Sequence, residues 1–165
     1  MDFFNTLSGA ITTDIIIIFV VFTFLFLFSV RYGKSSSTSL LLSLYVGILT
    51  FLSFPYLEEA TFLKSSEVQV TISHIVLFLV LVFMIHSVVR RFIFTEYSGS
   101  GFLKYGEMTI LSGVTTALLF AFAYHTIPLA TLYDFGDSID SLFSSQYFFW
   151  WLVAPMAALL LVSRE

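Results

Sequence analysis

The sequence predicts an all-α membrane protein, a polytopic bundle of transmembrane helices with five spans. Hydrophobic residues make up 58% of the 165 positions and charged residues only 11%, whereas about a quarter of a soluble domain is charged. The apolar residues also fall into long runs, and about 20 helical residues at ~1.5 Å each cross the ~30 Å hydrocarbon core of a bilayer. At this length a single membrane domain, residues 1–165, is expected.

The first span is predicted at residues 12–30. After Asp14 the sequence reads IIIIFVVFTFLFLFSV without a charge until Arg31, and a helix that is apolar all round suits lipid better than water. Thr12, Thr13 or Asp14 is expected to cap its N-terminus. Because no Lys or Arg precedes the apolar run, the segment lacks the positive region of a secretory signal, and we expect this helix to be retained.

The second and third spans are predicted at residues 39–57 and 68–89. Gly33 suits the end of a helix, and the serines at 35–39 suit the start of the next one. A connection this short should make the first two spans antiparallel neighbours. Pro55 should bend or end the second span, and a pair of arginines ends the third.

The fourth span is predicted at residues 108–127, before Pro128. In the next segment, 129–146, apolar side chains recur at helical spacing among aspartates, which predicts a short amphipathic helix on the membrane surface. The last apolar run, 147–162, is short and contains Pro155. It is either a short tilted span or a re-entrant helix.

The basic residues predict the orientation of the bundle. With the N-terminus outside and the C-terminus inside, six Lys and Arg residues fall on the cytoplasmic side and only Lys64 falls outside. Cytoplasmic segments of membrane proteins are enriched in Lys and Arg, so we expect this orientation. The six cytoplasmic residues are Arg31, Lys34, Arg90, Arg91, Lys104 and Arg164.

Small residues repeat at every fourth position on two of the predicted spans. Such stripes let helix backbones approach closely in lipid, where no hydrophobic driving force brings helices together. We therefore expect helix-packing faces there, although the same spacing also arises by chance in apolar segments. The stripes are Ser39, Ser43 and Gly47 on the second span and Gly113, Ala117 and Ala121 on the fourth.

Two histidines, His74 and His125, are candidates for a site inside the membrane, because the predicted spans place them at similar depths. Ionisable side chains within spans often mark function, and imidazole can bind a metal or haem or relay protons. The alternative is two interfacial side chains hydrogen-bonded to backbone or water. We favour that alternative because the apolar stretches hold no carboxylate, and the absence of cysteine excludes thiolate metal sites. We therefore predict no metal and no cofactor.

Catalytic motifs are missing from the sequence. Asp134-Phe135-Gly136 matches a protein-kinase triplet but stands without the rest of the kinase signature. There is no nucleophile elbow, no HExxH and no basic, aromatic patch suited to nucleic acid. We expect a protein that is not an enzyme and does not bind nucleic acid. Its expected partners are the lipid bilayer and either another membrane protein or further copies of itself.

The order of these elements resembles the colicin V production protein family of small bacterial membrane proteins (CvpA-like). The family begins with an aspartate, an apolar helix, a basic-glycine turn and a second helix rich in leucine and serine. A glycine-bearing later helix and an aromatic last segment follow. The residues that carry the resemblance are Asp14, Ile15–Val30, Arg31-Tyr32-Gly33-Lys34, Leu40–Leu44, Gly106, Gly113 and Phe148–Trp151.

The resemblance implies a multi-pass protein of the bacterial cytoplasmic membrane, linked to envelope homeostasis and toxin export, without catalytic residues. We therefore expect a cell-envelope or export accessory. The alternative is a small channel or a subunit of an oligomeric transporter, for which polar positions inside the spans, such as Ser73 and Thr115, would matter.

Overall fold

The computed structural model describes residues 2–57, 66–93, 102–127 and 132–162, without the side chains of 2–12, 102–104 and 138. These residues form helices and connecting turns, with no strand among them, so the prediction of an all-α fold is confirmed. The helices are α1 (Asp2–Leu52), α2 (Glu67–Phe92), α3 (Phe102–Thr126), α4 (Asp137–Leu142) and α5 (Phe148–Val162).

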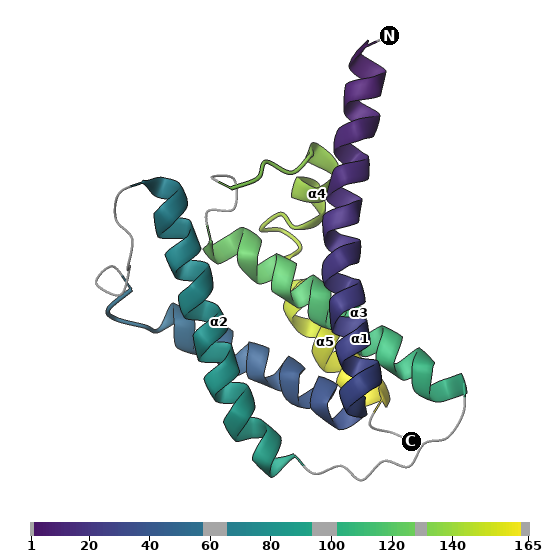
Figure 1. Cartoon of the computed structure of the whole chain (residues 1–165), viewed down its shortest axis with the longest axis vertical. Coiled ribbons are helices and arrows are strands. Elements are labelled where there is room, and N and C mark those ends of the chain that lie inside the picture. The colour runs from purple at the N-terminus through teal and green to yellow at the C-terminus, as the bar shows by residue number, and fades with distance from the viewer. Residues whose placement is uncertain (1, 58–65, 94–101, 128–131, 163–165) are drawn as a thin grey trace.

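The first two predicted spans are two limbs of α1 that meet at Gly33. Gly33 has φ 83° and ψ 171°, a combination that is essentially restricted to glycine. At this residue the chain changes direction sharply, so the second limb leaves the axis of the first (Figure 1). A single glycine therefore takes the place of the predicted turn.

Two predictions about the ends of these spans are wrong. Thr12, Thr13 and Asp14 do not cap a helix, because α1 already begins at Asp2. The serines at 35–39 are helical rather than a turn and N-cap. Two of their hydroxyls donate to carbonyls four residues back in the helix: Ser39 donates to Ser35 at 2.8 Å and Ser37 to Gly33 at 3.3 Å. This i to i−4 bonding lets serine remain in a helix interior.

The other helices keep the predicted order with shifted ends. The predicted span 39–57 ends earlier, at Leu52, and α2 covers 68–89 with one to three more residues at either end. α3 starts before 108, at Phe102, and α4 occupies the middle of the predicted amphipathic segment. α5 has 15 residues with Pro155 inside, which corresponds to about 22 Å and is shorter than a hydrocarbon core.

Three aromatic rings from three helices form the centre of the bundle. Phe51 of α1 lies 5.8 Å from Phe78 of α2 and 5.7 Å from Phe122 of α3, and the last two rings are 4.5 Å apart. All three side chains are buried. α1 packs against α2 and α3, and α5 packs against α3, so this ring cluster holds the main helices together.

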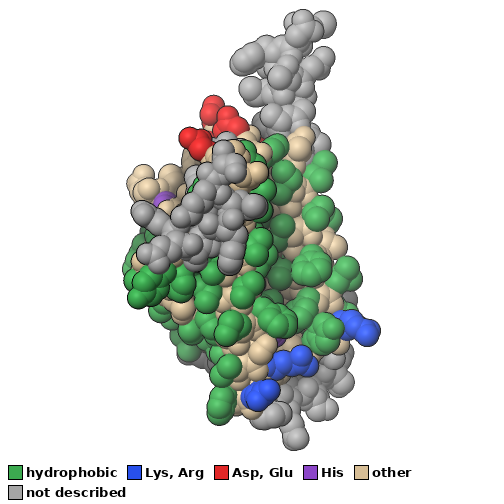
Figure 2. All heavy atoms as spheres, turned by 60° about the vertical axis from the view of Figure 1, so that its left-hand side comes forward, with side chains coloured by type: hydrophobic (Ala, Val, Ile, Leu, Met, Phe, Trp, Pro, Cys, Tyr) green, Lys and Arg blue, Asp and Glu red, His purple; other side chains and the backbone are tan. Residues whose placement is uncertain are grey.

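The outer surface is largely apolar. Large side chains such as Phe24 of α1 (70% exposed) and Phe83 of α2 (72% exposed) point away from the core. Three helical stretches are long and apolar enough to cross a membrane: Thr13–Leu52, Glu67–Phe92 and Tyr105–Thr126. Figure 2 shows hydrophobic side chains over the middle of the molecule, with acidic side chains at one end and basic side chains at the other. These features are those of a membrane protein.

Candidate functional site

One end of the bundle, which we call the acidic end, is organised around Asp14 of α1. Its side chain is only 1% exposed. One carboxylate oxygen accepts a hydrogen bond from the Tyr133 hydroxyl at 2.7 Å, and the other accepts one from the Gly136 amide at 2.9 Å. The remainder of the acidic end consists of Asp134, Asp137 and Asp140, which are all exposed. Asp14 therefore anchors a segment about 120 residues further along the chain.

The two donors to Asp14 are suited to this contact in different ways. The hydrogen bond to the Asp14 carboxylate raises the pKa of Tyr133, because the neutral phenol is the form that can donate. At Gly136 an added Cβ would lie 3.2 Å from the Asp14 oxygen, closer than ordinary van der Waals contact. Glycine therefore allows its amide to approach the carboxylate.

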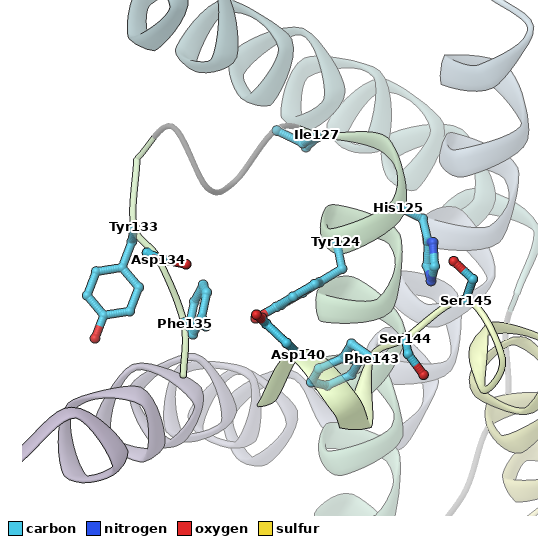
Figure 3. Close-up of a pocket in the computed structure, with 10 residues that line it drawn as sticks. All are labelled: Tyr124, His125, Ile127, Tyr133, Asp134, Phe135, Asp140, Phe143, Ser144 and Ser145. Carbon is cyan, nitrogen blue, oxygen red and sulfur yellow. The ribbon is translucent and has the colours of Figure 1, made fainter. Parts of the chain in front are cut away.

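Beside this contact lies a cavity of about 380 Å³, which we call the acidic-end cavity. Tyr124 projects from α3 and donates a hydrogen bond to Asp140 at 2.9 Å (Figure 3). Its ring centroid is 5.5 Å from that of Phe135 and 5.4 Å from that of Phe143. The lining residues are Tyr124, His125, Ile127, Tyr133, Asp134, Phe135, Asp140, Phe143, Ser144 and Ser145. Carboxylates and aromatic rings thus meet in one concave site.

The opposite end, which we call the basic end, is organised around Lys34. Its ammonium lies 3.0 Å from a carboxylate oxygen of Glu107 on α3 and donates to the Val162 carbonyl of α5 at 2.7 Å. The Ser35 hydroxyl donates to the Ile93 carbonyl at 3.1 Å, just after α2. The bend of α1, the end of α2, the start of α3 and the end of α5 therefore lie together.

The predicted topology residues in the described part of the chain gather at the same end. The Arg31 and Arg90 guanidinium groups lie 6.0 and 5.7 Å from the ring centre of Tyr32. Arg91 closes α2 beside Arg90, and Lys104 lies in the first turn of α3. Lys64 and Arg164 lie outside the described residues.

The two candidate histidines have different aromatic neighbours. The His74 ring lies edge-on to Phe51 at 6.2 Å, whereas the His125 ring lies 4.1 Å from Phe148 and lines the acidic-end cavity. Among the residues that the structure describes, no three His, Cys, Asp or Glu side chains are grouped as a metal site requires.

The two small-residue stripes have different surroundings. Ser39, Ser43 and Gly47 are buried, and a Cβ on Gly47 would lie 2.7 Å from a methyl group of Val82 on α2. On α3, Ala121 is buried, but Gly113 and Ala117 line an apolar groove of about 360 Å³. The other groove residues are Ile15, Ile18, Phe19, Phe22, Thr116, Phe120, Leu142, Phe143 and Trp151.

The two polar positions considered for transport, Ser73 and Thr115, are both buried. Their hydroxyls donate to the carbonyls of Gln69 and Leu111 at 2.8 and 2.6 Å. Each hydroxyl is therefore satisfied by its own helix.

Sequence reasoning missed the Asp14 contact and the acidic-end cavity. The available signal is the distribution of charge, because the predicted spans place Asp14 and the three later aspartates on the side opposite to the six basic residues. Comparison with known proteins identifies no relative: no family model, curated protein or solved structure matches this chain. The fold and site define a helical membrane protein with a concave acidic end.

Proposed function

We propose that this chain is a five-span protein of a bacterial cytoplasmic membrane and acts as a non-enzymatic accessory of the cell envelope or of export. The proposal extends the membrane character seen in the three long apolar helical stretches. The role as an accessory of the envelope or of export is inferred from the resemblance to CvpA-like proteins.

The observation that carries the accessory role is the filled centre of the bundle. The rings of Phe51, Phe78 and Phe122 lie within 4.5–5.8 Å of one another where α1, α2 and α3 meet. A conducting path needs polar or wide positions along its length, and here three apolar rings occupy the axis. The apolar faces point outward instead, so contact with another membrane protein is the activity best supported.

The contacts at the two ends support the proposed orientation. Since the bend of α1, the end of α2, the start of α3 and the end of α5 gather at the basic end, successive segments alternate between the two ends. The positive-inside tendency then favours a cytoplasmic basic end. It also favours an outside acidic end.

Single cysteines test this orientation, because the natural chain contains none. Asp137→Cys and Arg91→Cys replace exposed residues at the acidic and basic ends. In intact cells a membrane-impermeant maleimide should label the first variant. It should label the second only after permeabilisation. The reverse pattern would contradict the orientation.

Purification in mild detergent after cross-linking tests the accessory role. A stoichiometric membrane partner should be retained, and the chain alone in liposomes should pass no ions or small solutes. Flux through the purified chain, reduced by Thr115→Val or Ser73→Ala, would overturn the proposal.

A small channel or transporter subunit is the second candidate. The buried carboxylate of Asp14 and the Lys34–Glu107 ion pair favour it, because ionisable groups within or at the ends of spans often mark ion pathways. This candidate predicts flux in the same liposomes, or flux that appears when the chain is reconstituted as an oligomer.

A further inference from the structure

We propose that the acidic-end cavity binds a small organic cation, either a protonated amine or a quaternary ammonium group. Its carboxylates would supply negative charge and its aromatic rings would supply a weakly hydrated surface. This inference does not depend on the accessory role.

The cavity has the size of a small-molecule site. Its walls come from α3, from the segment that precedes α4, from α4 itself through Asp140 and from the connection between α4 and α5 (Figure 3). The volume of about 380 Å³ falls within the range of small-molecule sites, roughly 300–1,000 Å³. A ligand in this open cavity would contact several separate parts of the chain.

Aromatic rings cluster in the lining of the cavity. Tyr124 stands between Phe135 and Phe143, with ring centroids 5.5 and 5.4 Å from its own, and Tyr133 is 4.7 Å from Phe135. Clustered aromatic faces attract ammonium groups through their quadrupoles, and proteins recognise quaternary ammonium ligands in this way. A neutral apolar ligand would gain contact area but not this attraction.

The cavity also carries carboxylates. Asp134 and Asp140 both line the cavity, and Figure 3 shows the Asp134 carboxylate on the side of its loop that faces Tyr124. One Asp140 oxygen accepts the Tyr124 hydrogen bond, which leaves acceptor capacity on that carboxylate. Both carboxylates therefore favour a cationic occupant.

A metal ion fits this lining less well than an organic cation does. Calcium takes six to eight oxygen ligands. No group of three His, Cys, Asp or Glu suited to a metal occurs in the described part of the chain. The space between the two carboxylates is bordered by rings, which serve an alkylated ammonium better than a hydrated metal.

The Asp14 contact fixes one wall of the cavity in advance. Tyr133 and Gly136 are both bound to Asp14, so Asp134 and Phe135 lie between two anchored residues. A wall that is already ordered loses less conformational entropy when a ligand binds.

Binding of choline to the purified full chain tests the proposal, with uncharged 3,3-dimethylbutan-1-ol as the matched probe. Titration calorimetry and tryptophan emission are suitable readouts, because the Trp151 ring lies 5.3 Å from Phe143 of the cavity. Choline should bind saturably, and at least about 10-fold more tightly than the alcohol, which has the same shape without the charge.

Variants locate the binding. Asp134→Asn should weaken choline binding about 10-fold or more, whereas Asp137→Asn, a matched exposed aspartate outside the cavity lining, should change it less than about twofold. Phe135→Leu keeps the charge and should also weaken binding. If Asp134→Asn does not fold, Phe135→Leu tests the site in its place.

Binding in lipid nanodiscs distinguishes a lipid headgroup from a free solute as the source of the cation. Weaker choline binding in phosphatidylethanolamine discs than in phosphatidylglycerol discs supports the site with a lipid headgroup as its occupant. Equal binding supports a free solute. No saturable binding of choline, equal affinity for the alcohol, or equal effects of Asp134→Asn and Asp137→Asn would overturn the proposal.

Discussion

Asp14 lies within the first limb of α1 and Lys34 follows the bend at Gly33, and each joins α1 to distant segments through a largely buried side chain. The 20 residue steps from Asp14 to Lys34 correspond to roughly 30 Å of helix, about one hydrocarbon thickness. Lys34 has an opposite charge as its partner, whereas Asp14 is bound by a phenol and a backbone amide. Among the residues that the structure describes, Asp14 therefore has only neutral donors as hydrogen-bond partners, while Lys34 and Glu107 form a pair of opposite charges.

The two contacts should differ in the stability that is lost when Lys34 or Asp14 is replaced. Loss of Lys34 would leave a buried carboxylate without its counter-charge, but loss of Asp14 would leave only neutral donors. Burying an unpaired charge costs more than burying an unpaired neutral group. The basic-end contact should therefore be the more sensitive of the two.

The largest effect is expected for Lys34→Met. Glu107 is only 13% exposed, and breaking a largely buried ion pair costs about 3–5 kcal/mol. Thermal unfolding in detergent measures the loss, with Arg31→Met as the control because Arg31 is a neighbouring exposed cation. Adding Glu107→Gln should recover part of the stability. Equal effects of Lys34→Met and Arg31→Met would contradict this account.

A smaller loss is expected for Asp14→Ala. It removes the acceptor of the Tyr133 hydroxyl and of the Gly136 amide. Both donors are partly exposed and can bond to water, so the loss is that of two net hydrogen bonds rather than of two buried unsatisfied donors. Asp14→Asn retains one acceptor oxygen and should lose less. Asp137→Ala, an exposed aspartate at the same end, should leave the melting temperature unchanged. If Asp14→Ala lost more stability than Lys34→Met, the acidic-end contact would be the more sensitive of the two, which contradicts our expectation.

A third change, Gly136→Ala, tests the close approach at the acidic end. The added methyl would lie 3.2 Å from the Asp14 oxygen, and relieving such crowding costs about 1 kcal/mol. In an Asp14→Ala background this cost should vanish, because the two positions are coupled. Gly106→Ala is the control, since a Cβ there meets nothing within 4 Å. An unchanged cost in the double variant would show that Asp14 is not its cause.

The smallest effect is a pH dependence of Tyr133→Phe. The pKa of Tyr133 is raised by its bond to Asp14, so the stability that this bond provides is fully present below the ordinary tyrosine pKa of about 10. It is lost as pH rises through the raised value. The difference in melting temperature between wild type and Tyr133→Phe should be constant to about pH 9 and shrink above pH 10. Tyr147→Phe, at an exposed tyrosine, should show no such shrinking difference.

The apolar spans were predictable because their signal is local. Hydrophobicity averaged over about 20 residues needs no knowledge of a neighbour, so all the predicted spans correspond to helical stretches with shifted ends. The join at Gly33 was less predictable. Serines can cap a helix or donate to a carbonyl four residues back with the same local pattern, and the structure chose the second arrangement.

The candidate site was predictable only in part. The gathering of basic side chains at one end was visible in the order of charges, but the partner of Lys34 on α3 was not. Asp14 has the appearance of a capping residue in the sequence. Its burial depends on Tyr133 and Gly136, which are far away along the chain.

By itself, the sequence determined that this protein is helical, apolar on its surface and charged in opposite senses at its two ends, because composition and periodicity act over single turns and single spans. Only the tertiary structure decided that Asp14 lies buried against a later segment, that Phe51, Phe78 and Phe122 meet, and that carboxylates and rings enclose a cavity. These features are contacts between residues distant in sequence, so they exist only once the helices have packed.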